Sequence, residues 1–381
     1  MNHSRVGRGR WTQPNFVFSH CSDKSREVWK LLFNVLVLGA MRLFVTGGCG
    51  FVGNAFIRYV LEHYQPERIT NVDLLTYAGS ESTTLGFQRK FGDRYEFFHA
   101  DIADRVAMDD LLGRHSYYAV INFAAESHVD RSIASPAEFI RTNIGGTTVL
   151  LEAARRHGVK RLVQASTDEV YGPVQGEGAC KEDAPLRPSS PYSASKAAAD
   201  LLALAAFRTY DQDVVIVRST NNFGPYQHPE KFVPLAICRL LSRQSVPLYG
   251  DGKQRRDWLH VEDHCAAVFD VLLKGGAGEI YNVGAGVEKE NRELAETIAD
   301  YLKQPKTLIQ PVADRPGHDR RYLIDSTKIR EEIGWRPLRH FMPSLEETIE
   351  WYRENPDWWQ GMEVQTPLWA TVSVEQVGLT R

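Results

Sequence analysis

The sequence predicts an α/β fold in which a doubly wound parallel sheet is followed by a smaller C-terminal lobe. Between Met41 and Val217, short β-branched runs alternate with helical segments, as is typical of a parallel sheet covered by helices on both faces. A glycine-rich turn directly follows the first of these runs. Beyond Arg218 the alternation gives way to loops rich in Gly and Pro, such as Phe223-Gly-Pro-Tyr and Tyr249-Gly-Asp-Gly.

Six strands are expected in the sheet, and each is a short apolar run bounded by turn residues. They are Arg42–Thr46, Ile69–Asp73, Tyr95–Ala100, Ala119–Phe123, Arg161–Ser166 and Val214–Arg218. We expect residues 41–218 to form the sheet domain and residues 219–359 the lobe, with possible chain crossings back to the sheet. Within the lobe, Ser344–Asn355 has the period of an amphipathic helix.

The two ends of the chain fall outside this pattern. Residues 1–40 form an N-terminal extension that we expect to be disordered or loosely docked. Its basic residues and apolar run resemble a secretion signal, but the run leads straight into the strand Arg42–Thr46 and could not be removed cleanly. The tail 360–381 has no usable period.

Composition excludes several classes of function. A net charge of -3 provides no basic surface for nucleic acid. The five cysteines show no spacing suited to zinc or to a disulfide framework, so we expect no metal and a reducing, cytoplasmic location. The longest apolar stretch is shorter than the ~20 residues that a membrane helix needs, and no membrane partner is expected.

The glycine-rich turn predicts a dinucleotide site. Gly48, Gly50 and Gly53 have G-x-G-x-x-G spacing between a strand and a helix, where backbone N–H groups and the helix dipole favour a pyrophosphate. Asp73 lies twenty residues further on, at the end of the second strand, where a carboxylate accepts from ribose hydroxyls and repels a 2′-phosphate. The domain is therefore expected to be an NAD-binding Rossmann domain, with NAD favoured over NADP.

A Tyr–Lys pair is the expected catalytic centre. Tyr192 and Lys196 lie four residues apart on a helix that Ser190 and Pro191 should begin, so both side chains share one face. A nearby ammonium favours the ionised form of a phenol, and we expect it to lower the Tyr192 pKa from about 10. With the glycine turn and Thr167, twenty-five residues upstream, the pair forms the short-chain dehydrogenase pattern.

From Met41 to Trp359 the chain resembles the nucleotide-sugar 4,6-dehydratases, most closely those that act on dTDP-glucose. The resemblance is carried by long polar strings: Leu75–Gly79, Phe123–Ser132, Ser166–Gly172, Asn221–Lys231, Arg256–His264 and Asp314–His318. The most informative is Thr167-Asp-Glu169, because elimination of water across C5 and C6 needs an acid and a base beyond the groups that act at C4.

The resemblance implies a mechanism. Tyr192 takes the C4-hydroxyl proton as hydride passes to NAD, and Thr167 bonds to the same oxygen. Glu169 then removes the C5 hydrogen, Asp168 protonates the departing C6 hydroxyl, and the hydride returns to C6. The product is dTDP-4-dehydro-6-deoxyglucose, in a hydro-lyase step of deoxysugar biosynthesis. Asp168 needs a pKa well above about 3.9, which a closed pocket and Glu169 could provide.

Binding residues are also implied by the resemblance. Beside Tyr192 and Lys196, those for the cofactor are Gly47, Gly50, Phe51, Val52, Gly53, Asp73, Leu74, Leu75, Thr76, Asp101, Ile102, Phe123, Ala124, Ala125, Thr142 and Asn222. Those for the nucleotide sugar, beside Thr167, are Ser127, Asn221, Lys231, Phe232, Pro247, Tyr249, Arg256, Asn291, Asp314 and His318.

The resemblance further implies a homodimer formed by the helix after Pro136 and the helix that carries Tyr192. Three alternatives stay open at this point. The nucleotide could be UDP or CDP. A 4-epimerase or decarboxylase shares the scaffold but should lack Asp168 and Glu169. An NAD-sensing binding protein should have a broken Tyr192–Lys196 pair.

Overall fold

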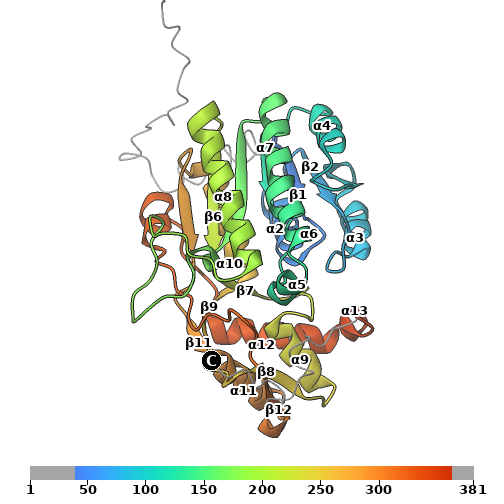
Figure 1. The fold of residues 1–381 in the computed structure, drawn as a ribbon. Coiled ribbons are helices and arrows are strands. Elements are labelled where there is room, and N and C mark those ends of the chain that lie inside the picture. Colours follow the sequence, from blue (N-terminus) through green and yellow to red (C-terminus); the bar gives the residue numbers. More distant parts are fainter. Residues whose placement is uncertain (1–38, 363–381) are drawn as a thin grey trace, which may run out of the picture.

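In the computed structural model, which describes residues 39–362, a seven-stranded parallel sheet has helices on both faces and a smaller lobe at one end (Figure 1). The fold class expected from the sequence is confirmed. The strand order is β10-β6-β5-β4-β1-β2-β3. Its members are β1 (Arg42–Thr46), β2 (Arg68–Asp73), β3 (Tyr95–His99), β4 (Ala119–Asn122), β5 (Arg161–Thr167), β6 (Val214–Ser219) and β10 (Ile280–Val283).

The six expected strands are all present, and none differs by more than one residue at either end. The expectation of only six was wrong, because β10 pairs in parallel with β6 as a seventh strand. Ile280–Val283 has only four residues, and it lies in the part of the sequence where glycine-rich loops suggested a separate lobe.

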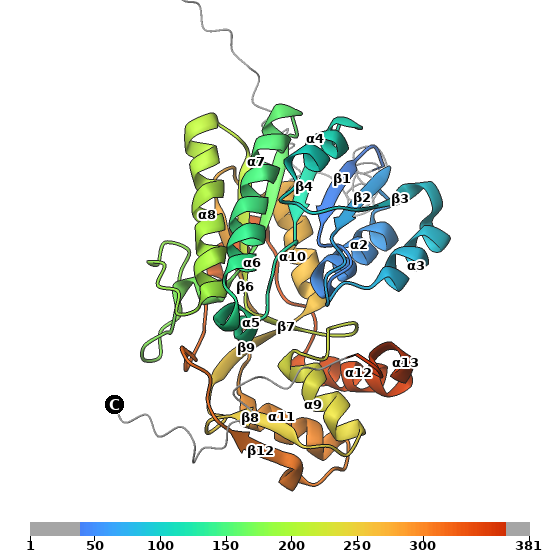
Figure 2. The same cartoon turned by 45° about the vertical axis from the view of Figure 1, so that its right-hand side comes forward.

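Alternation along the strands divides the core into two layers. In β1, Leu43 and Val45 face the layer that contains α2 (Phe51–His63) and α10 (Val261–Lys274), and Phe44 faces the opposite layer. The helix α3 (Glu81–Phe91) lies beside β3 (Figure 2). The opposite layer is formed by α4 (Arg105–Gly113), α7 (Thr147–Arg156) and α8 (Pro191–Tyr210), with α5 (Val129–Ala134), α6 (Ala137–Phe139) and the π-helix η4 (Ile140–Gly146) before α7.

Helix α8 begins where the sequence predicts. Ser190 is its N-cap and forms a capping box with Ser193, while Pro191 occupies the first turn. The long helix therefore has a fixed start directly before Tyr192. This fixed start determines how the Tyr192–Lys196 face meets the end of β5.

The lobe has its own core around Phe223, Ile237, Trp258 and Tyr352. It contains β7 (Asn221–Phe223), β8 (Val246–Tyr249), β9 (Arg255–His260), β11 (Glu288–Glu290), β12 (Ile309–Val312), α9 (Phe232–Leu241), α11 (Asn291–Tyr301), α12 (Phe341–Glu354) and α13 (Pro356–Trp359). Short turns complete the fold: η3 (Gly92–Arg94), η5 (Asp168–Tyr171), η6 (Lys306–Leu308) and η7 (Ile329–Ile333). The helix expected at Ser344–Asn355 begins three residues earlier, as α12.

The chain passes between the sheet and the lobe several times. Helix α10 packs on α2 and leads to β10 in the main sheet, after which β11 and α11 return to the lobe. Residues 329–335 cross again, since Ile329, Ile333 and Trp335 belong to the same core as Leu43. Most of the expected segments 1–40 and 360–381 lie outside the described residues. Within the described range, no helix has the length and apolar character to cross a membrane.

Candidate active site

A cavity of about 360 Å³ lies where the parallel strands end and the lobe begins. Residues at the C-terminal ends of β1, β2, β4, β5 and β6 line one side, and Lys231, Phe232 and Trp258 of the lobe line the other. This edge of an open α/β sheet is where ligands bind.

The glycine turn lies at one end of this cavity. Gly47 has φ +70°, and a Cβ there would lie 2.5 Å from the backbone nitrogen of Ala124. A Cβ on Gly53 would lie 2.2 Å from the carbonyl oxygen of Gly47. Because side chains are excluded at both positions, the backbone of the turn and the start of α2 are open to a bound pyrophosphate.

Asp73 supports the glycine turn. Its carboxylate accepts hydrogen bonds from the backbone nitrogens of Cys49, at 2.9 Å, and Leu75, at 2.8 Å. Burial raises the pKa of Asp73, and the two N–H groups oppose that rise. Each oxygen has a further lone pair, so Asp73 can hold the turn and still accept from a ribose hydroxyl.

Nearly all of the expected cofactor residues line the cavity. They are Gly47, Gly50, Phe51, Val52, Gly53, Asp73, Leu74, Thr76, Asp101, Ile102, Phe123, Ala124, Ala125, Thr142, Tyr192, Lys196 and Asn222. Leu75 does not, because its backbone N–H is bonded to Asp73 and its side chain packs by Gly79.

The five expected catalytic residues converge on the same cavity. Thr167 ends β5, and its hydroxyl accepts from the Glu169 backbone nitrogen at 3.3 Å and donates to Asp168 at 3.2 Å. Tyr192 lies close enough to Thr167 for the threonine hydroxyl to lower the pKa of the phenol. Lys196 donates to the carbonyl oxygen of Ala165 at 2.6 Å. The turn η5 and the first turns of α8 therefore face one another.

The two adjacent carboxyl groups have different environments. Burial, followed by the charge of Glu169, raises the pKa of Asp168 to about 8, which confirms the expected rise. Asp168 is 3% exposed, and its Oδ2 has no hydrogen-bond partner within residues 39–362. Burial also raises the pKa of Glu169, but Arg315, Arg256 and Lys231 oppose that rise. Their environments therefore favour a proton on Asp168 and a negative charge on Glu169.

The Tyr–Lys pair behaves differently from the expectation. The pKa of Tyr192 is raised, chiefly by burial and then by Glu169, so the expected decrease was wrong. Burial lowers the pKa of Lys196 to about 8, against the opposing charge of Asp200. The physical reason is that both groups are buried, so desolvation opposes the charged form of each.

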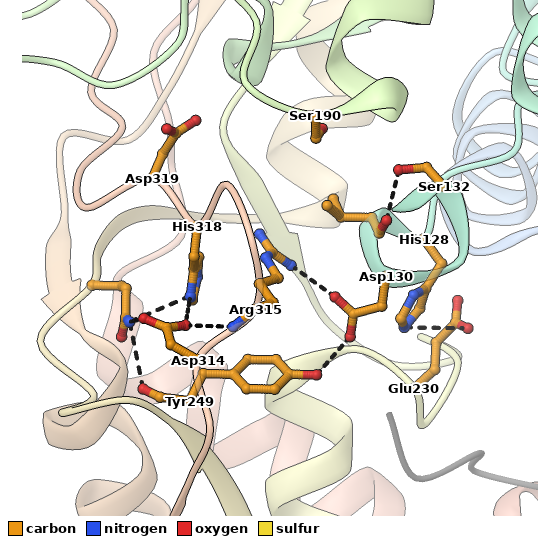
Figure 3. Close-up of polar contacts among 12 residues, drawn as sticks. His128, Asp130, Ser132, Ser190, Glu230, Tyr249, Asp314, Arg315, His318 and Asp319 are labelled. Carbon is orange, nitrogen blue, oxygen red and sulfur yellow. Dashed lines mark hydrogen bonds and ion pairs between the residues drawn. The ribbon is translucent and has the colours of Figure 1, made fainter. Parts of the chain in front are cut away.

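The expected substrate residues divide into two sets. Ser127, Thr167, Asn221, Lys231 and Phe232 line the cavity, but Pro247, Tyr249, Arg256, Asn291, Asp314 and His318 do not. The side chains of Tyr249, Arg256, Asp314 and His318 in this second set bond within the protein. Tyr249 donates to Asp130 at 2.6 Å, and His318 lies 2.6 Å from Asp314 (Figure 3). Arg256 donates to the carbonyl oxygens of Arg255 and Asp319.

Sequence reasoning missed several residues near the catalytic centre. Glu126, His228 and Glu230 line the cavity. Arg315 is the cation that most opposes the pKa rise of Glu169, and it lies 3.4 Å from Asp130 (Figure 3). All four belong to the polar strings noted above, so their position inside those strings was the available signal.

The glycine turn and the Tyr192–Lys196 pair at one cavity define the short-chain dehydrogenase class. The model of the GDP-mannose 4,6 dehydratase family matches residues 44–348. The chain is 49% identical over 327 residues to a dTDP-glucose 4,6-dehydratase of Streptomyces niveus. The aligned region covers 85% of this chain and 96% of the relative. It is 45% identical to dTDP-glucose 4,6-dehydratase 1 of Escherichia coli K12, with 84% and 94% covered.

Solved structures agree with this likeness. A dTDP-glucose 4,6-dehydratase of Streptomyces venezuelae with NAD and TYD bound superposes with a TM-score of 0.82 at 46% identity, covering 85% of this chain and all of the other. A UDP-glucose 4-epimerase of Thermus thermophilus in complex with NAD gives 0.76 at 30% identity, covering 83% of this chain and all of the other. The chain belongs to the dTDP-glucose 4,6-dehydratase family.

Proposed function

We propose that this protein is an NAD-dependent hydro-lyase that converts dTDP-glucose to dTDP-4-dehydro-6-deoxyglucose and water. The observation that carries the proposal is the Asp168–Glu169 pair, buried in one cavity with Tyr192 and Lys196 and divided by its surroundings into an acid and a base. A 4-epimerase has no use for such a pair. The relatives' names and the dehydratase structure with NAD and TYD support the same reaction.

The residues around the glycine turn fit NAD. Gly47 and Gly53 leave the backbone open, and Asp73 offers a carboxylate to the ribose. When bound, NAD supplies the acceptor for hydride from C4 and afterwards the donor of that hydride to C6. Tyr192, Lys196, Phe123 and the other cofactor residues proposed above complete its surroundings.

At C4, Tyr192 is the group that removes the hydroxyl proton, and Thr167 bonds to the same oxygen. The Thr167 hydroxyl is close enough to Tyr192 to lower the pKa of the phenol, so one sugar oxygen can meet both groups. Because burial raises the pKa of Tyr192, the phenol needs positive charge beside it to act as a base, and Lys196 is the nearby cation on the same helix face.

At C5 and C6, Glu169 removes the hydrogen that the C4 ketone has made acidic, and Asp168 gives its proton to the departing C6 hydroxyl. The pKa of about 8 keeps Asp168 protonated at neutral pH. Burial raises the pKa of Glu169 as well, but Arg315, Arg256 and Lys231 oppose that rise and favour its charged form. The elimination therefore has its acid and its base in place before the substrate enters.

The remaining assignments are parts of the same proposal. Lys231, Ser127 and Asn221 hold the sugar and diphosphate, with Arg256 and Tyr249 further out. Residues 41–218 form the cofactor domain, and the lobe within 219–359 holds the nucleotide sugar. The protein acts in the cytoplasm as a homodimer. Two large apolar side chains support the dimer face, since Ile140 on η4 is 57% exposed and Leu201 on α8 is 56% exposed.

The test is to incubate the purified protein with dTDP-glucose and, separately, with UDP-glucose, without an added hydride acceptor. We expect a 4-keto-6-deoxy product, which absorbs in alkali, from dTDP-glucose. Product from UDP-glucose alone would identify the other nucleotide. Unchanged sugars with NAD still bound would favour an NAD-sensing protein.

A variant of Glu169 tests its assignment as the base that removes the C5 hydrogen. Glu169→Gln should slow water loss by about 100-fold or more, while C4 oxidation continues and reduced cofactor accumulates. Glu96→Gln is a matched control, because Glu96 is a partly buried carboxylate on β3 outside the cavity lining. Dehydration at the wild-type rate in Glu169→Gln would disprove the assignment.

A further inference from the structure

A buried polar network lies next to the catalytic turn and outside the cavity lining. Its members are Arg218, Asp200, Tyr171 and Asn282, and none of them is more than 4% exposed. A charged pair with so little exposure needs an explanation, because removing both charges from water is costly.

The contacts of the network are specific. Arg218 donates from Nε to Asp200 at 2.8 Å and from Nη1 to the Tyr171 hydroxyl at 2.8 Å. The Tyr171 hydroxyl donates in turn to Asn282 at 2.8 Å. The guanidinium also lies 4.8 Å from the centre of the Tyr171 ring. Tyr171 is therefore held through both its ring and its hydroxyl.

The network joins the two elements that carry the catalytic side chains. Tyr171 is the last residue of η5, the turn that begins with Asp168 and Glu169. Asp200 lies one turn after Lys196 on α8. Arg218 lies on β6, directly between Ser166 of β5 and Asn282 of β10 in the sheet register. One guanidinium thus bonds to both the acid–base turn and the Tyr–Lys helix.

Stability alone does not account for this arrangement. A buried ion pair usually stabilises a fold no better than apolar side chains of similar volume. What apolar residues cannot supply is a fixed distance and direction between η5 and α8. Backbone bonds hold the ends of η5, from Gly172 to Glu169 and from Arg187 to Val170, but neither of these bonds reaches α8.

We propose that the Arg218–Asp200 pair acts through Tyr171 to hold the Asp168–Glu169 turn in position against helix α8, so that proton transfer at C5 and C6 is aligned with oxidation at C4. The three residues are positioning residues, since none lines the cavity. The proposal rests on the proposed function.

Tyr171→Phe tests the proposal, because it removes the hydroxyl and keeps the ring. With dTDP-glucose and NAD, we expect kcat to fall at least about tenfold while KM stays within about twofold, because a misplacement of about 1 Å can cost about 100-fold in rate. Oxidation at C4 should continue, so absorbance of bound reduced cofactor should build up in the steady state. A purely structural role would slow both half-reactions together.

Tyr281→Phe is the matched control. Tyr281 is 1% exposed, lies on β10, and its hydroxyl donates to Glu332 and accepts from the backbone nitrogen of Gly276, away from the cavity. It should keep the wild-type kcat and show no accumulation. Arg218→Lys keeps the positive charge but replaces the separate Nε and Nη1 donors with one ammonium nitrogen on a shorter side chain. It should therefore behave as Tyr171→Phe does, and it provides the test if Tyr171→Phe does not fold.

Three outcomes would overturn the proposal. The first is a Tyr171→Phe variant that matches the control while the wild type converts dTDP-glucose. The second is an equal fall in C4 oxidation and water loss. The third is a wild type that does not convert dTDP-glucose, which would refute the proposed function and this proposal together.

Discussion

At neutral pH, the buried carboxyl group of Asp168 should lower the free energy of unfolding of the protein. Its pKa of about 8 lies well above the ordinary value of 3.8, because burial and the neighbouring Glu169 disfavour its charge. The folded state therefore binds a proton that the unfolded state has already released. Stability from this group is fully present below pH ~4 and is lost as pH rises to ~8, by about 1.4 kcal/mol per pH unit.

Asp168→Asn removes this pH dependence and is nearly isosteric. At pH 7 the variant should unfold with a free energy higher by up to about 4 kcal/mol, from roughly three pH units between the two pKa values. Water loss from the sugar should fall by about 100-fold to 10,000-fold, since an amide cannot protonate a leaving hydroxyl.

The assay is urea unfolding of both proteins with saturating NAD at pH 5, 6, 7 and 8. The difference between wild type and variant should widen with pH, because groups common to both proteins cancel. Asp263→Asn is the control. This buried carboxylate accepts backbone N–H bonds from Leu338 and Arg339 outside the cavity, so its loss should destabilise the fold by about 1–3 kcal/mol. Equal pH slopes, or an Asp168→Asn protein less stable than wild type at pH 8, would refute the reasoning.

Two further predictions concern the cofactor. Gly53→Ala places a Cβ 2.2 Å from the Gly47 carbonyl oxygen and should weaken NAD binding by about 100-fold in a fluorescence titration. Gly86→Ala is the control, because a Cβ at this position of α3 meets nothing within 4 Å. It should keep the wild-type NAD affinity and gain about 1 kcal/mol of stability. Tyr77→Phe removes a hydrogen bond of 3.0 Å to Glu230 that joins the loop after β2 to the lobe, so NAD should leave the holoenzyme several-fold faster. Release at the wild-type rate would assign that contact to packing alone.

Short apolar runs and turn residues were enough to predict six strands of the sheet, but not the seventh. The strands of residues 42–218 differ from expectation by at most one residue at an end, because each is an apolar run between turn residues. Strand β10 was missed because four residues between glycine-rich loops carry too little pattern. Its place in the sheet is decided by pairing with β6, which no local pattern reveals.

In the site, too, the features set by short motifs were predicted, and those set by the complete fold were not. The glycine turn and the Tyr192–Lys196 spacing are local and led directly to the cavity. The raised pKa of Tyr192 required knowledge of burial, which depends on the complete fold. The influence of Arg315 on Glu169 required the contact of a residue near the C-terminus with a turn 146 positions earlier. Such distances are set by the lobe's placement, not by either segment alone.

Helix α10 and strand β10 return to the sheet in the middle of the lobe's sequence, so the lobe is not formed by one contiguous, exchangeable segment. A graft that replaced residues 219–359 with a relative's segment would also exchange the outermost strand of the sheet and part of its core. Recombining whole segments therefore disturbs folding and recognition together. New nucleotide preferences in this architecture are more accessible through single substitutions in the loops around the cavity than through shuffled domains.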